Sequence, residues 1–162
     1  MAEAASAAPS VYGRIEDGIH RLPLRVYWED TDASGIVYHA NYLRFAERAR
    51  TDLLRLSGVS QRDMMTTGVA LAVRSCQVDY LRPARLDDEL EVHSRLAELR
   101  GASVTALQSV RRQGDELVRL KVRIACIDAA GRPKRIPPAV RAALRPLALA
   151  PASLNSSEDH DG

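Results

Sequence analysis

Cysteine and aromatic residues are scarce in this chain of 162 residues. Aromatic side chains make up 4% of it, and the only two cysteines are Cys76 and Cys126. The two cysteines lie in separate apolar segments and form no Cys-x-x-Cys pair, which argues against a zinc knuckle or a thioredoxin-like motif. We therefore expect two buried free thiols rather than a disulfide.

Long apolar runs are also absent. No segment approaches the roughly 18 apolar residues that a membrane-spanning helix needs. The first residues, MAEAASAAPSVYGRIEDG, lack the basic and apolar regions of a secretory signal. These absences favour a cytoplasmic protein that does not insert into a membrane.

The overall composition is that of a soluble globular protein, with 46% apolar and 27% charged residues. The net charge of +2 favours an anionic ligand. It does not indicate nucleic acid, because Lys and Arg are spread along the chain. The length fits one domain, which we expect to span residues 19–145. Residues 1–18 and 146–162 are rich in small or polar residues and are expected to be mobile tails.

The hydrophobic pattern predicts one long helix and five strands. A strand covers HRLPLRVYWED and stops at the turn-rich TDASG. A helical stripe then begins at Tyr42 and ends at Ser57-Gly58. Residues 61–68 are expected to be a linking stretch. Alternating or β-rich segments follow at residues 69–81, 90–96, 103–110 and 118–126.

This order predicts an α+β fold in which the helix packs its apolar stripe on one face of a mostly antiparallel sheet. The other face and the edges of such a sheet must also be covered. A homodimer is one way to cover them.

The stretch EDTDASGIVYHAN carries the polar groups most suited to chemistry. Asp32 precedes a Gly that permits a tight turn, and His39 stands where the helix begins. Unpaired amides at a helix start can stabilise a carbonyl oxygen that becomes negative. Asp32 could then act as nucleophile or general base. The alternatives are structural: Asp32 or Asp30 satisfies turn amides, and His39 and Asn41 are polar residues of the first turn.

The run RVYWEDTDASGIVYHANYLRFAERAR, followed by VDYLRPARLDDELEV and LRGAS, resembles the hotdog-fold acyl-CoA thioesterases of the 4-hydroxybenzoyl-CoA thioesterase family. It is most similar to the bacterial YbgC type associated with the Tol-Pal system. The resemblance covers roughly residues 22–138. It implies a long helix wrapped by a curved sheet, and a dimer, often paired into a tetramer, with active sites at the subunit interface. It also implies an envelope-associated protein partner as one candidate partner.

Residue by residue, the resemblance places the family's catalytic carboxylate at Asp32 and its carbonyl-polarising amide at His39, whose imidazole is implicated in the YbgC type. Whether the carboxylate attacks the thioester or activates water stays open. Trp28 stands where several relatives have a Tyr, and it cannot supply a hydroxyl.

The same resemblance implies that the coenzyme A nucleotide binds near Arg100, with Gly101 and Ser103 allowing the ligand to approach the backbone. Arg and Lys side chains can form ion pairs with the phosphates of this nucleotide. Other cations are read as a solvated face; these are Arg82, Arg85, Arg119, Lys121 and Arg123. No cofactor is implied, because coenzyme A is part of the substrate.

Three other interpretations compete with the thioesterase. A hotdog hydratase or dehydratase also uses an Asp and a His near one helix. A non-catalytic acyl-CoA or protein-binding module would bind ligand without changing it. A metal site built from Asp32, His39 and Glu47 is the third. Glu47 is expected to pair with Arg50 or Arg44 on the helix rather than to take part in catalysis.

Overall fold

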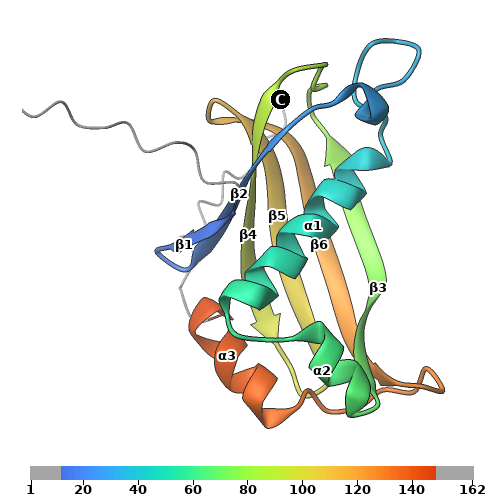
Figure 1. Ribbon diagram of the computed structural model, residues 1–162, viewed down its shortest axis with the longest axis vertical. Coiled ribbons are helices and arrows are strands. Elements are labelled where there is room, and N and C mark those ends of the chain that lie inside the picture. The colour runs from blue at the N-terminus through green and yellow to red at the C-terminus, as the bar shows by residue number, and fades with distance from the viewer. Residues whose placement is uncertain (1–11, 149–162) are drawn as a thin grey trace, which may run out of the picture.

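The computed structural model describes residues 12–148. It contains one curved sheet with the long helix α1 lying along one face (Figure 1). All neighbouring strands are antiparallel, in the order β1-β2-β4-β5-β6-β3. The strands are β1 (Arg14–Glu16), β2 (Ile19–Arg25), β3 (Val69–Tyr80), β4 (Glu89–Leu99), β5 (Ser103–Arg112) and β6 (Asp115–Asp128). The helices are α1 (Asn41–Leu56), α2 (Gln61–Thr66), α3 (Pro138–Ala148) and the 3-10 turn η1 (Trp28–Asp30).

The prediction of five strands was wrong, because the described chain forms a sixth, β1, inside the expected N-terminal tail. β1 pairs with β2 through a two-residue turn in which Glu16 faces Ile19. The turn residues Asp17 and Gly18 have φ of 53° and 74°. Asp-Gly is the favoured pair for such a hairpin turn, because both of its residues tolerate positive φ. The sequence therefore carried a hairpin signal that we overlooked.

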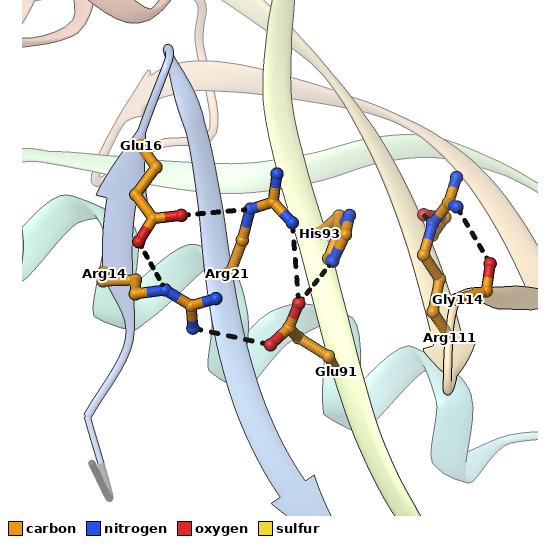
Figure 2. A network of polar contacts seen from close by, with 8 residues as sticks. Arg14, Glu16, Arg21, Glu91, His93, Arg111 and Gly114 are labelled. Atoms are coloured by element: carbon orange, nitrogen blue, oxygen red, sulfur yellow. Dashed lines mark hydrogen bonds and ion pairs between the residues drawn. The ribbon is translucent and has the colours of Figure 1, made fainter. Parts of the chain in front are cut away.

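Ion pairs fasten this short strand to the sheet (Figure 2). Arg14 bonds both Glu16 on its own strand, at 2.8 Å, and Glu91 on β4, at 3.4 Å. Glu91 also accepts from His93 at 2.6 Å and lies 3.8 Å from Arg21. A carboxylate shared among strands β1, β2 and β4 compensates for the few ladder bonds that a three-residue strand can make.

Helix α1 buries one face against the sheet, as its spacing predicted. The buried members of the stripe are Tyr42, Phe45, Ala46, Ala49, Leu53 and Leu54. They pack on inward-facing residues of the central strands, such as Val92, Val110, Val118 and Leu120. The neighbouring Leu43, in contrast, is 41% exposed and lies on the side of α1 that faces away from the sheet.

Two short helices were not predicted. α2 occupies the expected linking stretch, and the Oγ of its N-cap Ser60 accepts from the Asp63 amide. α3 begins at Pro138 and buries Val140, Leu144 and Leu147 at helical spacing. The folded part thus extends to Ala148 and starts at β1, beyond both expected limits of 19 and 145. Residues 1–11 and 149–162 of the expected tails lie outside the described residues.

The first predicted strand is shorter than expected. β2 ends at Arg25, and Trp28 to Asp30 form the turn η1 instead of continuing the strand. Trp28 is 79% exposed there. The break puts the acidic stretch in a loop above the start of α1.

Strand β3 forms one edge of the sheet, and most of its side chains are exposed. None of its 12 residues is buried, and Val73 is 53% exposed. Cys76 on this strand is an exposed free thiol, whereas Cys126 is a buried one, so the prediction of two buried thiols was wrong for Cys76. Among residues 12–148, no helix is long and apolar enough to cross a membrane.

Candidate active site

The acidic stretch forms a small hairpin that leads directly into α1. Thr31 and Val37 make an isolated antiparallel bridge, and the Asp32 amide donates to the Ile36 carbonyl at 2.9 Å. Gly35, at the bend, has φ of 76°, which favours glycine over residues with a Cβ. Asp32 and His39 therefore lie on opposite arms of one turn.

Asp30 is the structural acid of this hairpin. Its side chain is largely buried and accepts from the Tyr27 amide at 2.8 Å and from the Asn41 side chain at 2.7 Å. Asn41 is the first residue of α1. The pair Asp30–Asn41 therefore ties the loop to the helix start. The structural interpretation of Asp30 is confirmed, because it accepts from a turn amide.

Asp32 is the exposed acid of the same loop. One carboxylate oxygen accepts from the Ser34 amide at 2.8 Å, so the predicted turn-capping role is present. Within the described part of the chain, its other oxygen, Oδ2, has no hydrogen-bond partner. The local turn thus orients the carboxylate and leaves one oxygen available.

The start of α1 has no side-chain cap. Its N-cap residue is Ala40, whose side chain cannot accept a hydrogen bond. The carbonyl of Tyr38 accepts from the Asn41 amide at 2.8 Å. Among residues 12–148, no group accepts from the His39 amide. The first amides of a helix point outward along its axis and carry partial positive charge, so an uncapped start can bind a negative oxygen.

A half-open hollow of about 280 Å³ lies beside this helix start. Its wall combines the rings of His39, Tyr42 and Tyr80 with the cation Arg82 and the apolar residues Ile36, Val37, Leu81 and Pro83. Sequence reasoning missed Tyr80, whose hydroxyl donates to the His39 carbonyl at 3.0 Å. Burial raises the pKa of Tyr80, so the hydroxyl stays protonated and can donate at neutral pH. Its position at the end of a strand gave no signal in the sequence.

Not all expected residues gather here. Asp32 does not line the hollow, and no contact joins its carboxylate to His39 within the described residues. Glu47 is exposed on α1, and no ion pair joins it to Arg44 or Arg50 in the described chain. Its charge does act on Arg50, where it opposes the lowering of the Arg50 pKa by burial. Arg50 turns instead under the helix and donates to Gln108 at 2.9 Å. Nor do residues 12–148 contain any cluster of three metal-ligating side chains.

The predicted coenzyme A residues lie together at the turn between β4 and β5. The backbone amide of Arg100 donates to the Ser103 carbonyl at 2.8 Å. The exposed guanidinium of Arg100 forms an ion pair with the Glu98 carboxylate at 3.1 Å. No atom lies within 4 Å of where a Cβ on Gly101 would stand, so the backbone there is accessible. The Ile136 amide donates to the Gly101 carbonyl at 2.8 Å, which brings the basic segment RPKRI against this turn.

Comparisons with known proteins show the family of this chain. The family profile described as the thioesterase-like superfamily matches residues 26–144. The chain belongs to this superfamily. It is 41% identical over 124 residues to the acyl-CoA thioester hydrolase YbgC of Escherichia coli O6:H1, covering 75% of this chain and 92% of that protein. It is 40% identical over 128 residues to the acyl-CoA thioesterase YbgC of Haemophilus influenzae, covering 78% of this chain and 94% of that one.

Solved thioesterase structures share the fold. The crystal structure of a probable thioesterase from Bartonella henselae is 37% identical, with a TM-score of 0.70, and the match covers 74% of this chain and 99% of the other. The hotdog architecture expected from the motifs is therefore confirmed, with six strands in place of five.

Proposed function

We propose that this thioesterase-superfamily protein hydrolyses acyl-CoA thioesters with Asp32 and the His39 amide as its reacting groups. The observation that carries the proposal is the uncapped start of α1, where a free amide borders a hollow lined by apolar residues and aromatic rings. The relatives named acyl-CoA thioesterase, about 40% identical over most of the chain, support the reaction class.

The chemistry follows from the charges that develop. Attack on the thioester carbon places a negative charge on the carbonyl oxygen. A hydrogen bond from the His39 amide stabilises this charged oxygen more than it stabilises the neutral carbonyl oxygen of the bound substrate. As a general base, the Asp32 carboxylate takes a proton from water as the water oxygen adds to the carbon; the carbon–sulfur bond then breaks and the thiolate leaves. As a nucleophile, the carboxylate itself adds, expels the thiolate and forms an anhydride that water hydrolyses. The products are a free acid and coenzyme A in both cases.

The separation of Asp32 from the hollow is compatible with this role. A reacting thioester must fit between the two groups, with each about 3 Å from it. Direct contact between the carboxylate and the amide is therefore not expected before substrate binds. The Ser34 amide holds one carboxylate oxygen, so the other can face the substrate.

We also propose that the turn of Arg100, Gly101 and Ser103 holds the nucleotide part of coenzyme A. An exposed guanidinium and an accessible backbone are suited to phosphate groups. The adjoining RPKRI segment adds cations to the same end of the sheet.

A homodimer formed along the edge strand β3 completes the proposal. An edge strand of 12 residues with no buried member is a surface that an isolated subunit leaves uncovered. Tyr80, the last residue of β3, lines the hollow, so a partner subunit at this edge could close the active site. The family resemblance favours pairing of dimers into a tetramer and an envelope-associated partner of the Tol-Pal kind. The sequence pattern favours a cytoplasmic location.

Release of free thiol from a panel of acyl-CoAs tests the proposed roles. We expect Asp32→Ala to lower kcat by roughly a hundredfold or more, with little change in melting temperature because the side chain is exposed. Asp63→Ala, at another exposed aspartate on α2, is the matched control and should keep full activity. Undiminished turnover by Asp32→Ala would reject its assignment. A change in enoyl absorbance without thiol release would point instead to a hydratase.

A further inference from the structure

The backbone amides of His39 and Ala40, which precede α1, are oriented by different hydrogen bonds. The His39 N–H shares a peptide group with the Tyr38 carbonyl, and that carbonyl accepts from the Asn41 amide at 2.8 Å. The helix itself thus orients the His39 amide. The Ala40 N–H shares a peptide group with the His39 carbonyl, and that carbonyl accepts from the Tyr80 hydroxyl at 3.0 Å. The second peptide is therefore oriented by a side chain from β3, 41 residues away in sequence.

The Ala40 amide is free in the same way as that of His39. Among residues 12–148, no group accepts a hydrogen bond from it. A trans peptide is planar, with its C=O and N–H pointing in opposite directions. A donor that fixes the His39 carbonyl therefore also fixes the direction of the Ala40 N–H. Hydrogen bonding at the carbonyl further polarises the peptide and makes its N–H a stronger donor.

The position of Tyr80 suits this task. Its ring lies 6.2 Å from the His39 ring, edge to face, and 5.8 Å from the buried ring of Tyr42. Tyr42 is held in turn, because its hydroxyl oxygen accepts from the Ala84 amide at 3.0 Å. The ring of Tyr80 thus rests on the fixed ring of Tyr42, while its hydroxyl reaches the helix start.

We propose that Tyr80 is a positioning residue, which holds the Ala40 amide as a second donor beside the His39 amide at the developing oxyanion. This inference rests on the proposed role of the His39 amide. Two donors stabilise an oxyanion better than one, and loss of one donor from such a site costs roughly a hundredfold or more in kcat. Loss of Tyr80 loosens the donor without removing it, so the effect should be smaller.

The test is Tyr80→Phe, which keeps the ring and removes only the hydroxyl. We expect kcat for acyl-CoA hydrolysis to fall about tenfold, a part of the loss expected for a missing donor. KM should stay within about twofold, and the melting temperature within about 2 °C, because one half-exposed hydrogen bond contributes little to stability. Tyr27→Phe is the matched control, since this tyrosine is 61% exposed and lies outside the hollow.

The outcomes separate this inference from the assignment of Asp32. An unchanged kcat in Tyr80→Phe would overturn it, and so would a fall in kcat that comes with a matching fall in melting temperature or a rise in KM. If Asp32→Ala keeps full activity while Tyr80→Phe loses it, the carboxylate assignment fails and the positioning role stands.

Discussion

Asp30 and Asp32 are two residues apart, yet their surroundings give them different tasks. Asp30 is buried and satisfies two donors, the Tyr27 amide and the Asn41 side chain. Asp32 is exposed and, within residues 12–148, accepts a hydrogen bond only from the Ser34 amide. A carboxylate committed to two donors in the interior is a structural group, whereas one with a free oxygen at the surface can meet a substrate.

This difference leads to opposite expectations for stability. Asp30→Ala would leave the Asn41 side chain and the Tyr27 amide without their acceptor, which should cost about 2–4 kcal/mol of unfolding free energy. Asp32→Ala should cost less than about 1 kcal/mol. Urea unfolding of both variants measures the two costs. Equal losses would contradict the division of roles between the acids.

At the scale of elements, charged side chains around Glu91 join strands β1, β2 and β4. Burial alone would raise the pKa of Glu91, but the hydrogen bond from His93 and the nearby charge of Arg14 lower it overall. Burial lowers the pKa of His93 and outweighs the opposing effect of Glu91, while the charges of Arg21 and Arg111 lower it further. The end of the sheet that holds β1 thus contains a histidine that resists protonation (Figure 2).

This arrangement predicts a loss of stability in mild acid. The folded protein binds the His93 proton less readily than the unfolded chain does. The contribution of His93 is therefore complete above its unfolded pKa of about 6.5, and it decreases as the pH falls toward the lower folded value. Melting temperatures at pH 7, 6 and 5 should fall less steeply for His93→Asn than for the wild type. The lowered pKa of Glu91 adds a further loss only below about pH 4.5. Parallel slopes in the two proteins would rule out the contribution of His93.

At the scale of the whole molecule, the exposed edge strand β3 is the surface through which we propose that two subunits pair. β1, at the other edge, is only three residues long, and ion pairs surround it. β3 has 12 residues and exposes apolar side chains such as Val73. Short, charged edges resist pairing and long apolar ones favour it, so the pairing edge should be β3.

A charge at the centre of β3 should break the proposed dimer. In Val73→Glu a two-fold axis would bring like charges together, and we expect at least a tenfold weaker association by sedimentation, with a parallel loss of thiol release. Met65→Glu, on α2 at a side chain that is 70% exposed, is the control and should leave assembly unchanged. A Val73→Glu protein that assembles like the wild type would place the interface elsewhere.

Much of the fold was predictable because hydrophobic periodicity reports which face of an element is buried. The spacing from Tyr42 to Leu54 located α1 to within one residue at its start. The alternation in residues 118–126 marked the centre of β6. β1 and α2 were missed because they span too few residues for periodicity to appear. α3 was missed because no element was predicted in the last part of the expected domain, where it begins, and it runs on into the expected tail. Their signals were an Asp-Gly turn, the cap at Ser60 and the proline at 138.

The candidate site was predictable only where its parts are neighbours in sequence. The hairpin from Asp30 to Asn41 is local, so its acids, its glycine and the helix start could be predicted from the amino-acid sequence. The helical spacing of Glu47 and Arg50 indicated a pair between them. The hydrogen bond to Gln108 draws Arg50 beneath the helix, so Glu47 acts on it through charge without an ion pair in the described chain.

By itself, the sequence determined the family, the central helix and strands, and the loop that holds Asp32 and His39, because these depend on local pattern and on motifs within one stretch of chain. Only the tertiary structure decided which acid is buried, that β3 is an open edge, and that Tyr80 reaches the His39 carbonyl. Those features arise from contacts between segments tens of residues apart, and they depend on how the sheet curves around the helix rather than on any nearby residue.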